Sequence, residues 1–134
     1  MFLREIDTLL ARPALSDEAF GAYVRLNERF HALLCEMADS PVIARQLERV
    51  VSLPFASASA FVVAQATSAR SRDMFVVAQD QHRQVLDAIE RREAGRAEAL
   101  MREHSRIARH NMQLALREPG GFDMPGVQLI RKTA

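Results

Sequence analysis

The sequence is poor in the residues that build sheets, disulfides and membrane spans. Its 134 residues include no Trp, one Tyr, one Cys, five Gly and five Pro. So little aromatic content, beside abundant Ala, Leu, Arg and Glu, favours helices over strands. The single cysteine, Cys35, excludes an intramolecular disulfide and suits a reducing compartment. No apolar run approaches the roughly 20 residues that span a bilayer, and no signal peptide is evident. We therefore expect an all-α, cytoplasmic protein.

An excess of charge of either sign is also absent. The 18 basic and 17 acidic residues leave a formal net charge of +1. A domain that binds nucleic acid usually carries a basic face, so this chain by itself should bind DNA poorly. The length and the 49% hydrophobic content suit one domain with its own core. We expect a single domain over residues 1–134, of which about 119–134 form a loosely packed C-terminal extension.

What the sequence does contain is a series of amphipathic segments separated by helix breakers and caps. Pro13 ends the first segment, and Ser16 and Ser40 are expected N-caps, the second followed by a proline at the first helical position. The expected helices of this antiparallel bundle, about six, cover residues 2–11, 16–38, 41–51, a segment from about 56, 72–92 and 96–118. The segment from about 56 is either a short helix or a buried irregular connection.

In the predicted helix at 41–51, three apolar side chains share one face. Ile43, Leu47 and Val50 follow helical spacing and are expected to point inward, whereas the charged residues of this helix fall on the other side. We therefore expect this helix to pack against the core.

Three histidines lie within the apolar stripes of three predicted helices. They are His31, His82 and His104, and Asn27 lies one turn before the first of them. His82 is about 12 residues before the predicted turn of a helical hairpin and His104 about 10 after it, which places both at nearly the same height. Buried polar groups need partners, and a metal ion would serve all four. We therefore predict a divalent metal site at Asn27, His31, His82 and His104.

Each of these residues also has a simpler interpretation. A single histidine on an apolar face is more often a core residue that is hydrogen-bonded to a neighbour. Cys35, one turn beyond His31, would be a soft metal ligand, but a lone buried thiol more often only packs. His110 shares a face with Arg102 and Arg106, so it should be solvated and no ligand.

Two further polar residues fall close to the histidine positions. Tyr23 precedes Asn27 by one turn, and Asn111 follows His104 by two turns. Both are candidate effector-binding residues beside the metal. The alternative is that both are merely satisfied at the end of the bundle.

The chemistry of the four donors favours binding over catalysis. Three imidazoles and one amide are neutral, so the charge of a divalent ion stays uncompensated and one or more coordination positions remain open. Such a site attracts an anion, and a small carboxylate would bind by coordination and by charge. The acids that could serve as a general base are expected on outer faces: Glu28, Glu36, Asp80, Asp87 and Glu103.

Two runs of the sequence carry a family resemblance. They are LNERFHALLCEMADSPVIARQLERV and QDQHRQVLDAIERREAGRAEALMREHSRIAR. From about residue 16 to 116 the chain resembles the C-terminal effector-binding domain (FCD) of FadR-type regulators in the GntR family of bacterial transcription regulators. The resemblance implies a divalent metal, usually zinc or nickel, at Asn27, His31, His82 and His104. It also implies a small organic acid as effector and a homodimer whose N-terminal winged-helix domains bind operator DNA.

The sequence departs from that family in two ways. Family members most often have Asp where this chain has Asn27, which should weaken metal binding. The winged-helix domain is missing and the first helix is short, so the chain looks like a fragment or a truncated gene product.

Two rival functions stay open. Histidines in a helical bundle are also found in DinB-like metal-dependent hydrolases and transferases, in which metal-bound water is the reagent. A purely structural metal site, coordinatively closed, is the third possibility.

Overall fold

The described part of the chain is entirely helical. The computed structural model describes residues 2–12, 15–53, 71–115 and 117, and within them there are five helices and no strand. The helices are α1 (Phe2–Leu10), α2 (Asp17–Met37), α3 (Pro41–Val51), α5 (Ser71–Glu90) and α6 (Ala94–Ala115). This confirms the all-α prediction and five of the expected helices. The expected segment from about residue 56 and the extension at 119–134 lie outside the described residues.

The predicted caps begin two of these helices. The Ser16 side chain accepts a hydrogen bond from the backbone N–H of Ala19 at 3.2 Å, which satisfies a donor in the first turn of α2. Ser40 does the same for Ile43 at 3.4 Å, with Pro41 opening α3. Both helix starts therefore follow from local side-chain chemistry. Among the described helices, none combines the length and the apolar character that crossing a membrane would require.

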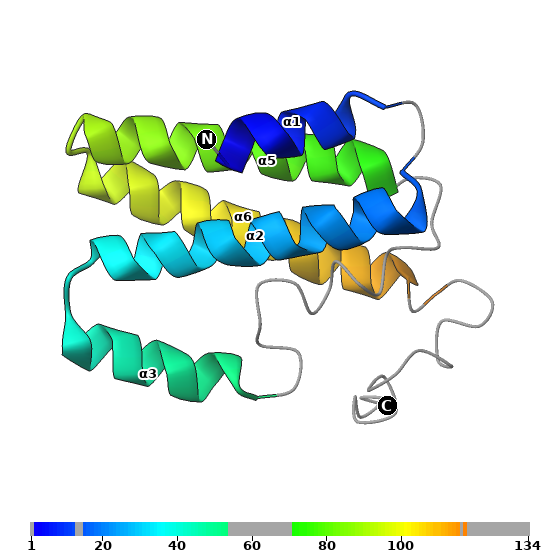
Figure 1. Cartoon of the computed structure of the whole chain (residues 1–134). Coiled ribbons are helices and arrows are strands. Elements are labelled where there is room, and N and C mark those ends of the chain that lie inside the picture. The colour runs from blue at the N-terminus through cyan, green and yellow to red at the C-terminus, as the bar shows by residue number, and fades with distance from the viewer. Residues whose placement is uncertain (1, 13–14, 54–70, 116, 118–134) are drawn as a thin grey trace.

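Four helices form the body of the molecule. Helices α5 and α6 make an antiparallel hairpin, and α1 packs against both α2 and α5 (Figure 1). An apolar cluster joins α1, α2 and α5 through Ile6, Leu10, Tyr23 and Phe75. The ring of Tyr23 stacks on Phe75 with 4.6 Å between ring centroids. This cluster fixes α1 beside the first half of α5.

Helix α3 lies outside this body and corrects one prediction. Ile43 is 49% exposed and Val50 is 51% exposed, so neither points inward, and Leu47 is only partly buried. In Figure 1, α3 runs below α2 and away from α1 and α5. The apolar periodicity of α3 identifies one side of a helix, but it does not determine whether another helix covers that side.

Candidate metal centre

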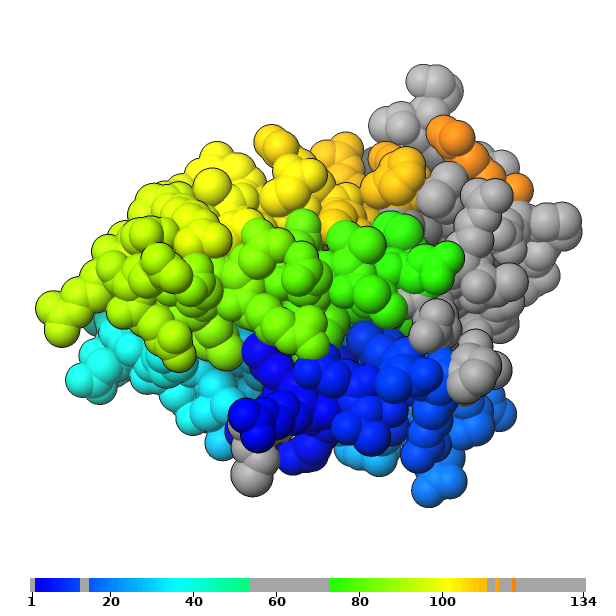
Figure 2. All heavy atoms as spheres, turned by 90° about the horizontal axis from the view of Figure 1, so that it is seen from above, coloured from blue at the N-terminus to red at the C-terminus, as the bar shows by residue number. Residues whose placement is uncertain are grey.

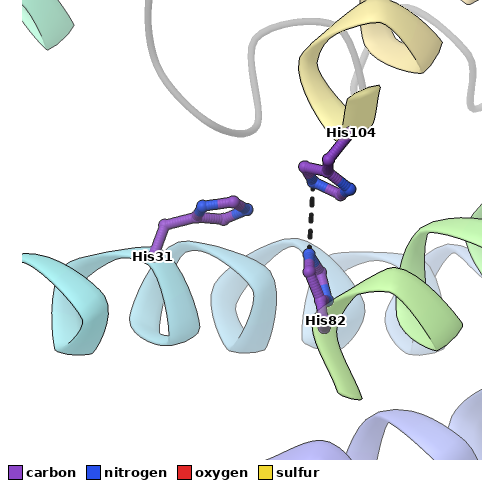
Figure 3. A group of neighbouring side chains, drawn as sticks. All are labelled: His31, His82 and His104. Carbon is purple, nitrogen blue, oxygen red and sulfur yellow. Dashed lines mark hydrogen bonds between the residues drawn. The ribbon is translucent and has the colours of Figure 1, made fainter. Parts of the chain in front are cut away.

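The structure brings together the three histidines that the sequence singled out. His31 lies on α2, His82 on α5 and His104 on α6, and one ring nitrogen of each lies within 4.8 Å of the others. Figure 3 shows the three rings turned toward one another. The ring centroid of His31 lies 5.2 Å from the ring centroid of His82 and 5.4 Å from that of His104. Three helices thus contribute one donor each to a common point.

The hairpin turn sets the register of two of these donors. Arg92 has a left-handed φ of 58°, and its N–H donates to the carbonyl of Ile89 at 2.9 Å. The N–H of Glu93 donates to the carbonyl of Ala88 at 2.8 Å. This pair of bonds is a Schellman motif, which ends α5 and reverses the chain. His82 and His104 therefore lie at the same level of the hairpin, as expected, with their Nε2 atoms 3.3 Å apart.

A buried glutamine fixes the tautomer of His82. The Gln79 side-chain nitrogen donates to the backbone carbonyl of Leu3 and to Oδ1 of Asp7, both at 2.8 Å. Its oxygen must therefore face the ring of His82, where it lies 3.3 Å from Nδ1. A carbonyl oxygen only accepts, so His82 Nδ1 carries the proton. The lone pair of His82 is then on Nε2, which faces the cluster.

A second glutamine, Gln81 of α5, faces the ring of His104 on α6. His104 Nδ1 lies 3.1 Å from Oε1 of Gln81. With the Gln81 amide in this orientation its carbonyl oxygen only accepts, so Nδ1 donates and the His104 lone pair is on Nε2 as well. In these tautomers both Nε2 atoms, 3.3 Å apart along the contact dashed in Figure 3, present lone pairs, which repel unless a cation lies between them. Two nitrogens bound tetrahedrally to zinc, each at about 2.0–2.1 Å, lie about 3.3 Å apart. The donor set therefore fits a metal ion.

His31 supplies a further observation in the same direction. Its Nε2 is buried and has no hydrogen-bond partner within the described part of the chain. A buried polar atom without a partner is costly and rare in native proteins. A metal ion bound at the cluster would satisfy it.

Burial keeps all three rings neutral. It lowers the pKa of His31 to about 4, helped by repulsion from a charge on His104. It lowers the pKa of His82 to about 2, helped by His104 and His31, and it also lowers the pKa of His104. Neutral imidazole is the form that binds metal ions. The cluster is thus in its metal-binding form at pH 7.

The other predicted site residues are placed as follows. Asn27 is 3% exposed on α2, one turn before His31, and Cys35 is a free, partly buried thiol one turn after it. Tyr23 lies in the apolar cluster against Phe75, which favours its interpretation as a packing residue. Asn111 falls in α6, but its side chain lies outside the described part of the structure.

The predicted outer residues do lie outside. Glu28, Glu36, Asp80 and Glu103 are exposed, and the Asp87 side chain is 41% exposed. Asp87 is paired with Arg96 at 2.8 Å and with Arg91 at 2.9 Å, and these bonds lower its pKa. His110 is exposed, as expected. Among the described residues, the group of potential metal donors consists of histidines without a carboxylate.

Two functional candidates were missed in the sequence. Gln79 lies four residues after Phe75 and three before His82, on the same buried stripe, and it is only 2% exposed. The anomaly that pointed to His82, a polar residue in an apolar stripe, was present at Gln79 as well. Asp7 gave no such signal, because its link to Gln79 depends on how α1 packs against α5.

A comparison with protein families decides what kind of domain this is. The model of the FCD domain matches residues 3–106. The chain belongs to the FCD family. FCD domains are the effector-binding, regulatory domains of GntR-family transcription regulators. No curated protein and no solved structure matches the chain. All three clustered histidines lie within the matched range of this FCD domain, whereas Asn111 lies beyond it.

Proposed function

We propose that this FCD domain binds a divalent metal ion, zinc or nickel, and uses it to sense a small organic acid. The proposed ligands are Asn27, His31, His82 and His104. The observation that carries the proposal is the trio of neutral, converging imidazoles, with the unsatisfied Nε2 of His31 and facing Nε2 atoms on His82 and His104. A metal there would supply Lewis acidity and positive charge.

The chemical class of the effector follows from the charge of the proposed ligands. All four are neutral, so they leave the charge of the ion for an exogenous anion to balance. A carboxylate oxygen is a suitable ligand for zinc and nickel in this setting. Asn111 is the proposed polar contact for the acid beside the metal, and Tyr23 is a weaker candidate since it packs against Phe75.

The proposed biological role is regulation of transcription in the cytoplasm. The domain would form a homodimer, and DNA would be bound by a winged-helix domain outside these 134 residues. The near-zero net charge of the chain supports the proposal that another domain binds the DNA. We propose no enzymatic activity, because a hydrolase of the DinB-like type would need an acid or base close to the metal. The exposed positions of Glu28, Asp80 and Glu103 support that choice.

Metal content tests the proposal. The parent chain should purify with, or take up from added salt, roughly one zinc or nickel ion per chain, measured by plasma emission spectrometry after gel filtration. His82→Ala and His104→Ala should lose it, because each removes one of the converging nitrogens. His110→Ala is the matched control, since His110 lies exposed on the same helix as His104.

An equal metal content per chain in the parent and in both cluster variants would contradict the proposed metal site. Turnover of a carboxylate substrate by the zinc-loaded chain would favour the rival enzyme, whereas recovery of the acid unchanged supports a sensor.

A further inference from the structure

We propose that Gln79 is a positioning residue of the metal centre, and that through Asp7 and Leu3 it couples the docking of α1 to metal binding. This inference rests on the proposed function, because it requires a metal on His82. It concerns a helix that supplies none of the proposed ligands.

The contacts of Gln79 connect two distant parts of the chain. Its amide nitrogen bonds to α1 twice, at the carbonyl of Leu3 and the carboxylate of Asp7, while its oxygen accepts from the ring of His82. Gln79 is 2% exposed and His82 is 1% exposed, so both groups of the central bond are shielded from water, whereas the Asp7 carboxylate is partly exposed. Figure 2 shows α1 lying directly against α5 on this side of the molecule.

The orientation of the Gln79 amide is fixed, which makes it a positioning group. Turning the amide over would place its oxygen against the Leu3 carbonyl and the Asp7 carboxylate, both of which only accept. Gln81, the equivalent group for His104, is only partly buried, and the bond it makes to the centre comes from within the α5–α6 hairpin. The two glutamines thus bond to two histidines, and within the described part of the chain Gln79 is the one that also bonds to α1.

A metal on His82 strengthens this chain of bonds. Coordination at Nε2 withdraws electron density from the ring, so the N–H at Nδ1 becomes a better donor to the Gln79 oxygen. The polarised amide then donates more strongly to Leu3 and Asp7, since linked hydrogen bonds reinforce one another. Metal binding should therefore hold α1 more firmly. By thermodynamic reciprocity, α1 docking should raise metal affinity by the same factor.

A second contact between the same helices gives a control. Arg83 forms an ion pair with Asp7, and both side chains are partly exposed. Removing Arg83 weakens the attachment of α1 without touching the bonds of Gln79. An Arg83 variant therefore shows the effect of a weaker attachment of α1 alone, with the hydrogen bond between Gln79 and His82 intact.

The experiment compares zinc affinity and protection of α1 in the full chain. Zinc affinity is measured by competition with a chromophoric chelator, and the exchange of the α1 backbone amides is measured by mass spectrometry with and without zinc. Gln79→Met and Gln81→Met should each weaken zinc binding by about 10-fold to 100-fold. Zinc should slow α1 exchange in the parent and in Gln81→Met, but not in Gln79→Met.

A second pair of variants does not depend on Gln79→Met being folded. Asp7→Ala and Arg83→Ala both remove the ion pair, and both should speed α1 exchange. Only Asp7→Ala also removes an acceptor of Gln79, so only Asp7→Ala should reduce the zinc response of α1.

Three outcomes would overturn the inference. Parent-like zinc affinity in Gln79→Met overturns the positioning role, and an equal zinc response of α1 in Asp7→Ala and Arg83→Ala overturns the coupling. In either case the metal site itself stands. A parent chain that binds neither zinc nor nickel overturns the proposed function and this inference with it.

Discussion

At the residue scale, Asn27 is the ligand whose charge can be changed most simply. Asn27→Asp places a carboxylate at a position that is 3% exposed. With metal bound, the added negative charge should tighten zinc binding by tenfold or more, on the order of 1 kcal/mol or more after the cost of burying the charge. Without metal, the buried charge should lower the free energy of unfolding. Calorimetric titration with zinc measures the first effect. Unchanged zinc affinity would mean that Asn27 does not coordinate.

The three clustered histidines give the metal-free protein a pH-dependent stability. In the unfolded chain each histidine titrates near its usual value of about 6.5. In the folded chain the pKa of His31 is lowered to about 4 and that of His82 to about 2. Below about pH 6.5 the unfolded state therefore binds protons that the folded state does not. The stability should be constant above that pH and fall as the pH drops from 6.5 toward 4.

Urea unfolding in chelator at pH 7.5 and pH 5 measures this loss, because few carboxylates titrate in that interval. His110→Gln, at an exposed position, should leave the difference between the two pH values unchanged. Equal stability at both values in the parent would contradict neutral burial of the cluster.

At the scale of elements, the turn between α5 and α6 controls how His82 meets His104. Arg92 adopts a left-handed φ of 58° at the position where glycine is usually preferred. Arg92→Gly should raise the free energy of unfolding by about 0.5–1 kcal/mol, because it removes backbone strain that exceeds the entropy cost of glycine. Arg92→Ala is the control and should give no such gain. Destabilisation by glycine, seen in urea unfolding, would contradict the turn geometry.

The helices could be predicted where local chemistry decides them. Ser16 and Ser40 accept bonds from residues three positions ahead, so both helix starts are local properties. The outward face of α3 could not be predicted, because Ile43 and Val50 would have the same spacing if another helix covered them. Burial depends on a partner element, and periodicity contains no information about the partner.

In the candidate site too, features set by local geometry could be predicted, whereas features set by the packing of helices could not. His82 and His104 could be placed opposite each other because a helix rises by a fixed amount per residue. The role of Asp7 could not be predicted, because it follows from the packing of α1 on α5. The metal-facing nitrogens depend on the amides of Gln79 and Gln81, which the sequence shows only as polar residues near histidines.

At the scale of the whole molecule, metal and effector should act as ligands of the folded state. Zinc at about 100 times its dissociation constant adds about 2.7 kcal/mol to stability, which raises the Tm of a domain of this size by several degrees. Small mono- and dicarboxylates should raise the Tm further only when zinc is present. Thermal-shift measurements with and without chelator check this, and His82→Ala should show neither shift. A carboxylate shift that survives complete metal removal would contradict a metal-bound acid.

The origin of the three histidines has a consequence for chain connectivity. His82 and His104 are 22 residues apart in one hairpin. His31 lies on α2, so in the sequence it is separated from His82 by α3 and the chain between α3 and α5. A metal that joins the three histidines closes two loops of the chain. The short loop between His82 and His104 is already closed by the α5–α6 hairpin, so the metal adds little entropy cost there, and the longer loop runs from His31 to His82. The entropy of closing a flexible loop grows slowly, by about 0.6 kcal/mol for each doubling of length. The centre therefore constrains the spacing of the helices strictly and the length of the chain between α3 and α5 only weakly.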